Sequence, residues 1–504
     1  MSGLDQDTDT GDDEPQAAQC EARASASDVV GSGSRIRSGL RQARRHLSAV
    51  LSHLDRLRLE YVYLAIAVPW GLALLVMMPP LQVPDEPAHL YRAWGLAQGR
   101  FLPPRDFIES VPSNVHSLQQ SLPVRSIGDP TPYPDYPWNR IGPLLSESIS
   151  KEHVTIATGV PSQNPVAYAP QALGVLVAKL TGFSPLGGFY LARLFNLLTA
   201  VALTFLAIRL APWGRVMLLL VALLPVTISE MASVSPDALM MSGAFLFTGM
   251  CLHLAREDNL RTRQLLALLL VGVLLLTVKP SYFPIVGLVL MIPRSSFGSP
   301  RRHLAWTAGI VAAVVAVSVI GALMTPVASN DLPGPARGPV QAGADPVSQA
   351  KHVLSDPASF AQVLVNTFRN EGFTQAYNMV GLLSWLSIQV SAVAVLLIAG
   401  LTILFLPGFP GDPPVPRLER AVLLSVGMLT VICVCLFVYL AMAPVGGSSV
   451  PTLQGRYFTP AMPLLLLGAY RIRWQRKWFA LVLIFAVFVL VAVTTMRAVW
   501  YHFP

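Results

Sequence analysis

Long apolar runs separated by short arginine-bearing segments repeat along most of the chain. A helix needs about 20 predominantly apolar residues to cross the hydrocarbon core of a bilayer. Runs near that length predict eleven transmembrane helices, at 61–78, 189–208, 215–232, 237–254, 264–279, 281–293, 304–325, 380–406, 420–443, 457–470 and 478–498. The predicted fold is therefore an all-α polytopic membrane protein whose membrane domain covers 61–498. The run 281–293 is short, so a tilted or broken element is expected there.

Two long polar stretches are predicted outer loops, the first at 79–188 and the second at 326–376. Within the first, the run 166–180 is barely long enough to span and contains Pro170, Gln171 and Lys179. If this run crosses the membrane, every later arginine-bearing loop falls outside. If it lies along the outer surface, those loops fall inside, as the positive-inside rule requires. We therefore expect a surface helix, a cytoplasmic N-terminus and a short outer tail at 499–504.

The N-terminal region lacks the apolar residues that a folded core needs. Residues 1–34 are acidic and rich in Ser, Gly and Ala, which is typical of a disordered tail. No apolar stretch precedes a small-residue cleavage site, so the first membrane helix is expected to be the anchor. Residues 35–60 carry seven arginines among leucines at helical spacing. They predict either an amphipathic juxtamembrane helix on an anionic leaflet or a solvated run that only sets orientation.

Composition supports a membrane protein and excludes several other classes. Hydrophobic residues make up 53% of the 504 residues and charged residues only 13%, against about 25% charged in soluble domains. A soluble enzyme, a disordered protein and a coiled coil are therefore excluded. The net charge of +8 comes from arginines in short loops, so it reports topology and predicts no nucleic-acid partner. The four cysteines indicate neither a disulfide framework nor a zinc site.

The adjacent acids Asp85 and Glu86 follow the first predicted membrane helix, in the sequence VPDEPAHLYR. Two carboxylates in the low-dielectric headgroup zone should have separated pKa values, which suits a general base or a metal ligand. The alternative is ordinary helix capping, because Pro87 follows directly and acids in a first turn favour the helix dipole. The residues alone leave both interpretations open.

Six motifs carry a resemblance to known membrane proteins. The string PDEPAHLYRAWGLAQGRFLPP resembles the first outer loop of glycosyltransferases of the GT-C superfamily, which take sugars from polyprenyl-phosphate donors. Together with NPVAYAPQALG, SVSPDALM, TVKPSYFP, GLLSWL and LQGRYFTP, it is similar to the bacterial membrane-protein family catalogued as domain of unknown function 2142. The similarity covers about residues 60 to 498.

The superfamily resemblance implies roles for particular side chains. Asp85 would be the base that deprotonates the acceptor hydroxyl, and Glu86 would assist it. The residues expected to bind the donor phosphate are Lys279, Tyr282, Arg456 and Tyr457. Residues expected to support the site are His89, Arg92, Arg193, Asp237 and Gln454.

Each of these side chains also has a plainer interpretation. Lys279 could snorkel to the headgroups. Asp237 could be an ordinary N-terminal helix residue after Ser-Pro. Arg193 could pair with Asp237 or Glu230, and His89 could be an interfacial packing residue.

The implied function is transfer of a sugar from a polyprenyl-phosphate donor to a cell-envelope glycan or glycolipid on the outer face of a bacterial plasma membrane, with inversion. No cofactor is required by the residues, although a divalent cation, Mg²⁺ or Mn²⁺, between the phosphate and Asp85 or Glu86 stays open. The alternatives are a transporter or flippase of lipid-linked saccharides and a non-catalytic protein of envelope assembly. A transporter is expected to show repeats and midplane charges, whereas the charges here gather near one face.

Overall fold

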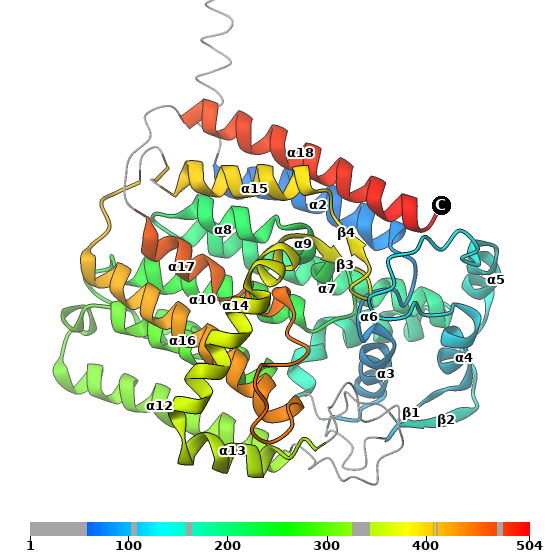
Figure 1. Ribbon diagram of the computed structural model, residues 1–504, viewed down its shortest axis with the longest axis horizontal. Helices are drawn as coiled ribbons and strands as arrows, with labels where there is room; N and C mark the ends of the chain where they lie inside the picture. Colours follow the sequence, from blue (N-terminus) through cyan, green and yellow to red (C-terminus); the bar gives the residue numbers. More distant parts are fainter. Residues whose placement is uncertain are drawn as a thin grey trace, which may run out of the picture. The chain divides into compact units, whose positions relative to one another are not determined.

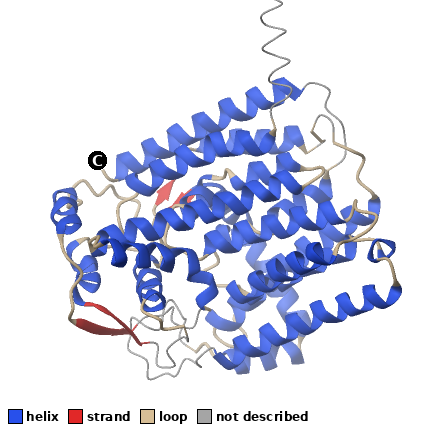
Figure 2. Ribbon diagram, turned by 180° about the vertical axis from the view of Figure 1, so that it is seen from behind, coloured by secondary structure: helices blue, strands red, loops and turns tan. Residues whose placement is uncertain are grey.

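The computed structural model describes residues 58–101, 108–157, 164–324, 343–406, 408–409, 412–470 and 477–504. Helices make up nearly all of the regular structure, with two short pairs of strands (Figures 1 and 2). The helical class predicted from the sequence is confirmed. The predicted disordered tail at 1–34 and the basic segment up to residue 57 lie outside the described residues.

Five helices are long and apolar enough to cross a membrane: α2 (Leu59–Met77), α7 (Pro185–Leu210), α10 (Asp237–Leu254), α16 (Arg417–Met442) and, within α18 (Lys477–His502), the part Phe479–His502. Shorter apolar helices are α11 (Thr262–Val278), η3 (Pro280–Met291) and α15 (Ala392–Phe405). The long helix α12 (Pro300–Met324) covers the run expected at 304–325. The chain thus has the apolar helices of a membrane protein, while the number of eleven crossings stays a prediction.

The helix expected at 215–232 is two helices, α8 (Arg215–Ala222) and α9 (Pro225–Met231). Pro225 lacks the backbone N–H that a continuous helix would use, and it occupies the first turn of α9. The element expected at 281–293 is η3, a 3₁₀ helix, which agrees with the expectation of an irregular element there. The break between α8 and α9 brings the end of α9 into the site described below.

The prediction of a single helix at 380–406 is also wrong. Helix α14 (Pro357–Gly381) ends there, and strands β3 (Leu382–Leu383) and β4 (Ile388–Gln389) form a small antiparallel hairpin before α15. Much of the expected second outer loop is helical, in α13 (Pro346–Ser355) and α14. The side chains of Asp345 and Asp356 cap these two helices. The helix expected at 457–470 is divided into η6 (Gly455–Phe458) and α17 (Met462–Ala469).

The first predicted outer loop contains its own structure. Its elements are α3 (Glu86–Ala97), β1 (Ile108–Pro112), α4 (Ser113–Ser121), η1 (Trp138–Arg140), α5 (Ile141–Ser146), β2 (His153–Ala157), η2 (Pro165–Tyr168) and α6 (Ala169–Thr181). Strands β1 and β2 pair antiparallel, with Ile108 opposite Ala157. Helix α6 has 13 residues, which rise only about 20 Å, short of a bilayer core. It packs against α7, and a Cβ on Gly174 would lie 2.4 Å from the Leu191 carbonyl oxygen.

The C-terminal end of α18 lies against the first loop. The Tyr133 backbone N–H donates to the His502 carbonyl at 2.7 Å, and the rings of Tyr136 and Phe503 lie 5.6 Å apart. The first loop and the end of α18 are therefore in direct contact. Another short helix, η4 (Arg294–Phe297), lies between η3 and α12 along the chain.

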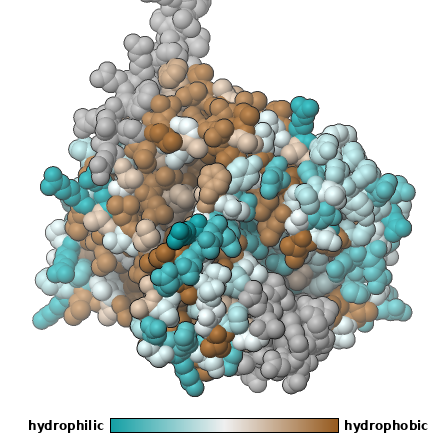
Figure 3. Space-filling view, viewed as in Figure 1, coloured by the Kyte–Doolittle hydropathy of each residue, from teal (hydrophilic) through white to brown (hydrophobic). Residues whose placement is uncertain are grey.

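Hydrophobic side chains cover the exposed faces of the outermost helices. Figure 3 shows apolar residues gathered over α15 and α18, and more hydrophilic residues over the first loop. On α15, Leu396 and Ile403 are each 70% exposed. Apolar surface of this extent on a folded chain marks contact with a partner or a membrane, and the latter matches the composition.

Candidate functional site

Asp85 precedes α3 and leaves its carboxylate uncommitted. Its backbone is in the left-handed region, with φ 60° and ψ 8°, and its side chain makes no capping hydrogen bond to the helix. The side chain is exposed, whereas most of its neighbours in the turn are buried. Asp85 therefore occupies the N-cap position of α3 without making a capping hydrogen bond. A non-glycine residue held in this conformation is a feature that concentrates at functional sites.

Glu86 has the opposite environment. Its two carboxylate oxygens accept from Arg193 Nε and Nη2, each at 2.8 Å, and both side chains are fully buried. Glu86 Oε1 also accepts from the Val234 backbone N–H at 3.2 Å. Arg193 Nη1 donates further to the carbonyls of Leu75 and Met78 at the end of α2. Glu86 thus joins α3, α7 and the end of α2, and Arg193 does not pair with Asp237 or Glu230.

A second group of buried charges joins four elements. Arg456 Nη1 donates to Glu230 Oε1 at 2.7 Å, and Arg456 Nε lies 3.6 Å from Asp237 Oδ2. Lys279 Nζ pairs with Asp237 Oδ1. The Tyr457 ring lies beside both cations, with its centroid 5.4 Å from Lys279 Nζ and 5.7 Å from the Arg456 guanidinium carbon. The structure therefore brings together three residues predicted to bind a donor phosphate, and pairs two of them with acids.

Tyr282, the remaining residue in the predicted phosphate set, fixes the backbone of this group. Its hydroxyl donates to the Tyr457 carbonyl at 2.9 Å. That hydrogen bond ties η3 to η6, so the phenol is already committed to a structural contact in this structure. Its placement next to Tyr457 agrees with the predicted neighbourhood.

His89 lies between Asp85 and the second group of charges. Its Nδ1 shares a hydrogen bond with the Tyr168 hydroxyl at 2.7 Å. Burial lowers the pKa of His89 to about 4, with the charges of Asp85 and Asp237 raising it and those of Lys279 and Arg456 lowering it. His89 is therefore neutral near pH 7. Because these four charges all act on one imidazole, Asp85 belongs electrostatically to the same cluster as Asp237, Lys279 and Arg456.

The turn between α9 and α10 is held by two amide side chains that the sequence did not single out as site residues. Asn196 Nδ2 donates to the Ser233 and Ser235 carbonyls at 2.8 and 2.9 Å. Gln171 Nε2 donates to the Ser235 carbonyl at 3.2 Å, to Val234 at 3.3 Å and to Asn196 Oδ1 at 3.0 Å. Both side chains are buried among apolar helices. An amide side chain buried in an apolar run must find hydrogen-bond partners. Amides inside apolar runs were therefore the signal by which the sequence could have indicated these two residues.

The segment around Arg456 packs closely against α14. A Cβ on Gly455 would lie 2.3 Å from the Met379 backbone nitrogen and 2.4 Å from the Gln375 carbonyl oxygen, so only glycine permits this approach. Arg456 Nε, Gln454 Oε1 and Thr459 Oγ1 are buried polar atoms without a hydrogen-bond partner in the described part of the chain. Buried polar atoms are rarely left without partners, so this segment offers hydrogen-bonding capacity to a ligand.

Arg92, a predicted supporting residue, makes structural contacts outside the cluster. It is fully buried and forms an ion pair with Glu109 at 3.2 Å. Its guanidinium also donates to the carbonyls of Arg100 and Phe101. These contacts tie α3 to the chain that leads into β1.

Charge in the cluster is nearly balanced. With His89 neutral, the two cations Lys279 and Arg456 form ion pairs with two acids, Glu230 and Asp237. A phosphate would therefore have to replace a carboxylate at one of the cations. Among the described residues, no three His, Cys, Asp or Glu side chains are grouped so as to hold a metal ion.

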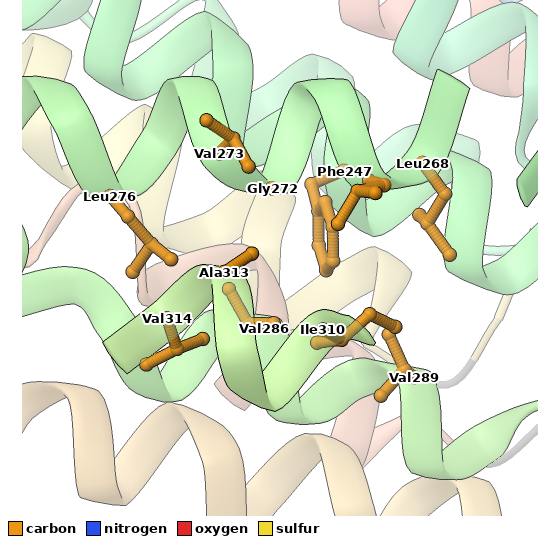
Figure 4. A pocket seen from close by; sticks show the side chains of 11 residues that line it. Phe247, Leu268, Gly272, Val273, Leu276, Val286, Val289, Ile310, Ala313 and Val314 are labelled. Atoms are coloured by element: carbon orange, nitrogen blue, oxygen red, sulfur yellow. The ribbon is translucent and has the colours of Figure 1, made fainter. Parts of the chain in front are cut away.

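A small apolar crevice lies between the helices. Side chains of α10, α11, η3 and α12 line it, and all those drawn in Figure 4 are hydrocarbon. Leu276 and Val314 lie towards one end of the crevice, and Leu268 and Val289 towards the other (Figure 4). Lys279 follows Leu276 by three residues along the chain. The Leu276 end is therefore the one nearest the charged cluster in sequence.

The comparisons with known proteins place most of the chain in one family. The family model described as "Predicted membrane protein (DUF2142)" matches residues 69–465. No curated protein and no solved structure matches the chain. The matched range includes Asp85, Glu86, Asp237, Lys279 and Arg456.

Proposed function

The chain belongs to the DUF2142 family of membrane proteins, and from this premise we propose that it transfers a sugar from a polyprenyl-phosphate donor to a hydroxyl group of a cell-envelope acceptor. The observation that carries the proposal is the division of labour between adjacent acids. Glu86 is buried and fully engaged by Arg193, whereas Asp85 is exposed and free of capping contacts. A carboxylate that is accessible and held by its backbone suits a general base.

In the proposed reaction Asp85 accepts the proton of the acceptor hydroxyl. The hydroxyl oxygen forms a bond to the anomeric carbon as the bond from that carbon to the phosphate oxygen breaks. The polyprenyl phosphate leaves with the bonding electron pair and an additional negative charge. Attack from the side opposite the phosphate inverts the anomeric configuration.

Lys279 and Arg456 are the groups that would stabilise the leaving phosphate. An arginine can contact a phosphate through two N–H groups, and fixed cations aimed at developing charge supply a large part of catalysis. Arg456 Nε already has no hydrogen-bond partner among the described residues and lies 3.6 Å from Asp237 Oδ2. Donor binding would exchange part of the Asp237 contact for a phosphate contact.

The donor's hydrocarbon chain would pack against the apolar side chains of α11, η3 and α12 that line the crevice (Figure 4), and these helices would have to move apart because the crevice itself is too narrow for the chain. A polyprenyl chain buries apolar surface there without requiring any polar partner. Since Lys279 follows the last turn of α11, which includes Leu276, a chain in the crevice would present its phosphate near that lysine. The arrangement lets the donor enter sideways from the bilayer.

A transfer assay tests the proposal directly. Membranes containing the wild type, Asp85→Asn or Asp258→Asn at equal abundance would receive extracted lipid-linked sugar donors carrying a radiolabel. Asp258 is an exposed acid beyond the opposite end of α10 and is the matched control. We expect the wild type and the control to transfer label to an acceptor and Asp85→Asn to lose at least a hundredfold. If all three proteins instead moved intact lipid-linked sugar across the bilayer to the same extent and transferred none, the chain would be a flippase and not a glycosyltransferase.

A further inference from the structure

Left-handed backbone conformations are concentrated in two turns far apart in the sequence. The described residues include five non-glycine positions with positive φ. Four of them are Leu81 at 67°, Asp85 at 60°, Ser384 at 57° and Leu386 at 56°. The first two belong to the turn before α3, and the other two to the hairpin between β3 and β4. Each such position is strained and persists only when its surroundings enforce it.

The two turns are hydrogen-bonded to each other. Trp385 Nε1 donates to the Leu81 carbonyl at 3.0 Å, and Ser384 Oγ donates to the Gln82 carbonyl at 2.8 Å. Ser384 is only 2% exposed and Gln82 is fully buried. The two contacts therefore lie in a protected environment, where hydrogen bonds are worth most and are costly to lose.

Two further hydrogen bonds hold the turn before α3 from its other side. Gln82 Nε2 donates to the Pro123 carbonyl at 2.9 Å, and Gln82 Oε1 accepts from the Arg125 backbone N–H at 3.3 Å. Leu81 and Gln82, four and three residues before Asp85, are thus held from both sides. No glycine occurs between Leu81 and Asp85 to make this conformation easy.

We propose that the β3–β4 hairpin is a positioning element for Asp85, acting through the hydrogen bonds that Trp385 and Ser384 make to residues 81 and 82. By holding the turn in its left-handed conformation, the hairpin keeps the Asp85 carboxylate away from the free N–H groups of α3 and directed to solvent. This inference rests on the proposed function for its effect on catalysis. The contact itself stands independently of that function.

The first test substitutes Trp385→Phe, which retains an aromatic ring and removes the N–H donor. We expect kcat for sugar transfer to fall about tenfold with KM for the donor nearly unchanged, because binding groups are untouched. Adding Leu81→Gly to Trp385→Phe should recover part of the loss, since glycine adopts positive φ without the steric cost. Trp500→Phe, on a tryptophan that is 63% exposed, is the control and should leave transfer unchanged.

The second test does not depend on transfer activity. Hydrogen–deuterium exchange of peptides covering residues 79–90 should be faster in Trp385→Phe than in the wild type, at equal melting temperature, and unchanged in Trp500→Phe. Unchanged exchange in Trp385→Phe would overturn the proposal. A wild type that transfers no sugar but shows the exchange difference would reject the proposed function and keep the positioning contact. If Trp385→Phe lowers kcat and Leu81→Gly restores nothing, the hairpin does not act through this turn.

Discussion

The Arg193 guanidinium donates to both carboxylate oxygens of Glu86 at 2.8 Å, and neither side chain is accessible to solvent. Asp85, the residue immediately before Glu86, faces solvent. Two acids that look equivalent in the sequence are therefore a structural anchor and a free carboxylate. The backbone conformation at Asp85 separates them, because it points consecutive side chains into different environments.

The Glu86–Arg193 pair should be essential for stability. Arg193→Met leaves a buried carboxylate without its cation and also removes donors from the Leu75 and Met78 carbonyls. We expect a loss of about 3–5 kcal/mol, the usual cost of breaking a buried pair from one side. Thermal unfolding of the detergent-solubilised protein measures it. The double variant Glu86→Gln with Arg193→Met should be more stable than Arg193→Met alone, and equal melting temperatures would contradict a dominant charge penalty.

Gly455→Ala should displace Arg456 and impair the site without unfolding the protein. The added Cβ would meet the α14 backbone at 2.3 Å from the Met379 nitrogen, so η6 or α14 must shift. We expect transfer to fall by more than tenfold, since displacements near 1 Å in a site carry large catalytic costs. Gly400→Ala on α15 has nothing within 4 Å of its Cβ and serves as the control. Full activity in Gly455→Ala would show that Arg456 tolerates the displacement.

Stability should depend on the protonation of His89. Its pKa of about 4 in the folded protein lies below its ordinary value of 6.5, so the unfolded chain takes up this proton first as the pH falls. The contribution that neutral His89 makes to the stability of the folded protein is complete above pH 6.5, and it is lost as the pH falls from 6.5 towards 4. Melting temperatures measured over that range should fall more steeply for the wild type than for His89→Gln, which cannot titrate. Parallel curves of melting temperature against pH for the two proteins would show that His89 does not contribute to the pH dependence of stability.

Asn196→Leu should destabilise the turn between α9 and α10. The substitution preserves size but leaves the Ser233 and Ser235 carbonyls without donors from this side chain. A buried group without its hydrogen bond costs about 1–3 kcal/mol, so the melting temperature should fall by several degrees. Asn370→Leu, at an exposed position on α14, is the matched control and should change it little. An unchanged melting temperature in Asn196→Leu would show that the contacts of Gln171 and Glu86 are sufficient to hold the turn.

The local sequence was sufficient for the class of the protein and for the approximate position of the long apolar helices. Long apolar runs predict helices because backbone groups inside a membrane must be satisfied within the segment. Helix α10 has the bounds that the sequence predicts, 237–254. Helix α11 ends at Val278, directly before Lys279 and one residue before the predicted end. The sequence also placed Asp85, Asp237, Lys279 and Arg456 near one face, since charges avoid the apolar interior of a run.

Tertiary packing alone decided which of these charges are free and which are paired. Arg193 meets Glu86 across 107 positions of the chain, and Arg456 meets Glu230 across 226, distances at which local patterns carry no information on partners. The breaks at Pro225 and after Gly381 likewise depend on whether neighbouring elements can satisfy the freed backbone groups. Thr227 Oγ1 donates to the Val221 carbonyl beside the first break, and the Val390 backbone N–H donates to the Gly381 carbonyl at the second. The sequence by itself therefore determined a helical membrane protein, and the packing of distant segments determined which carboxylate is exposed.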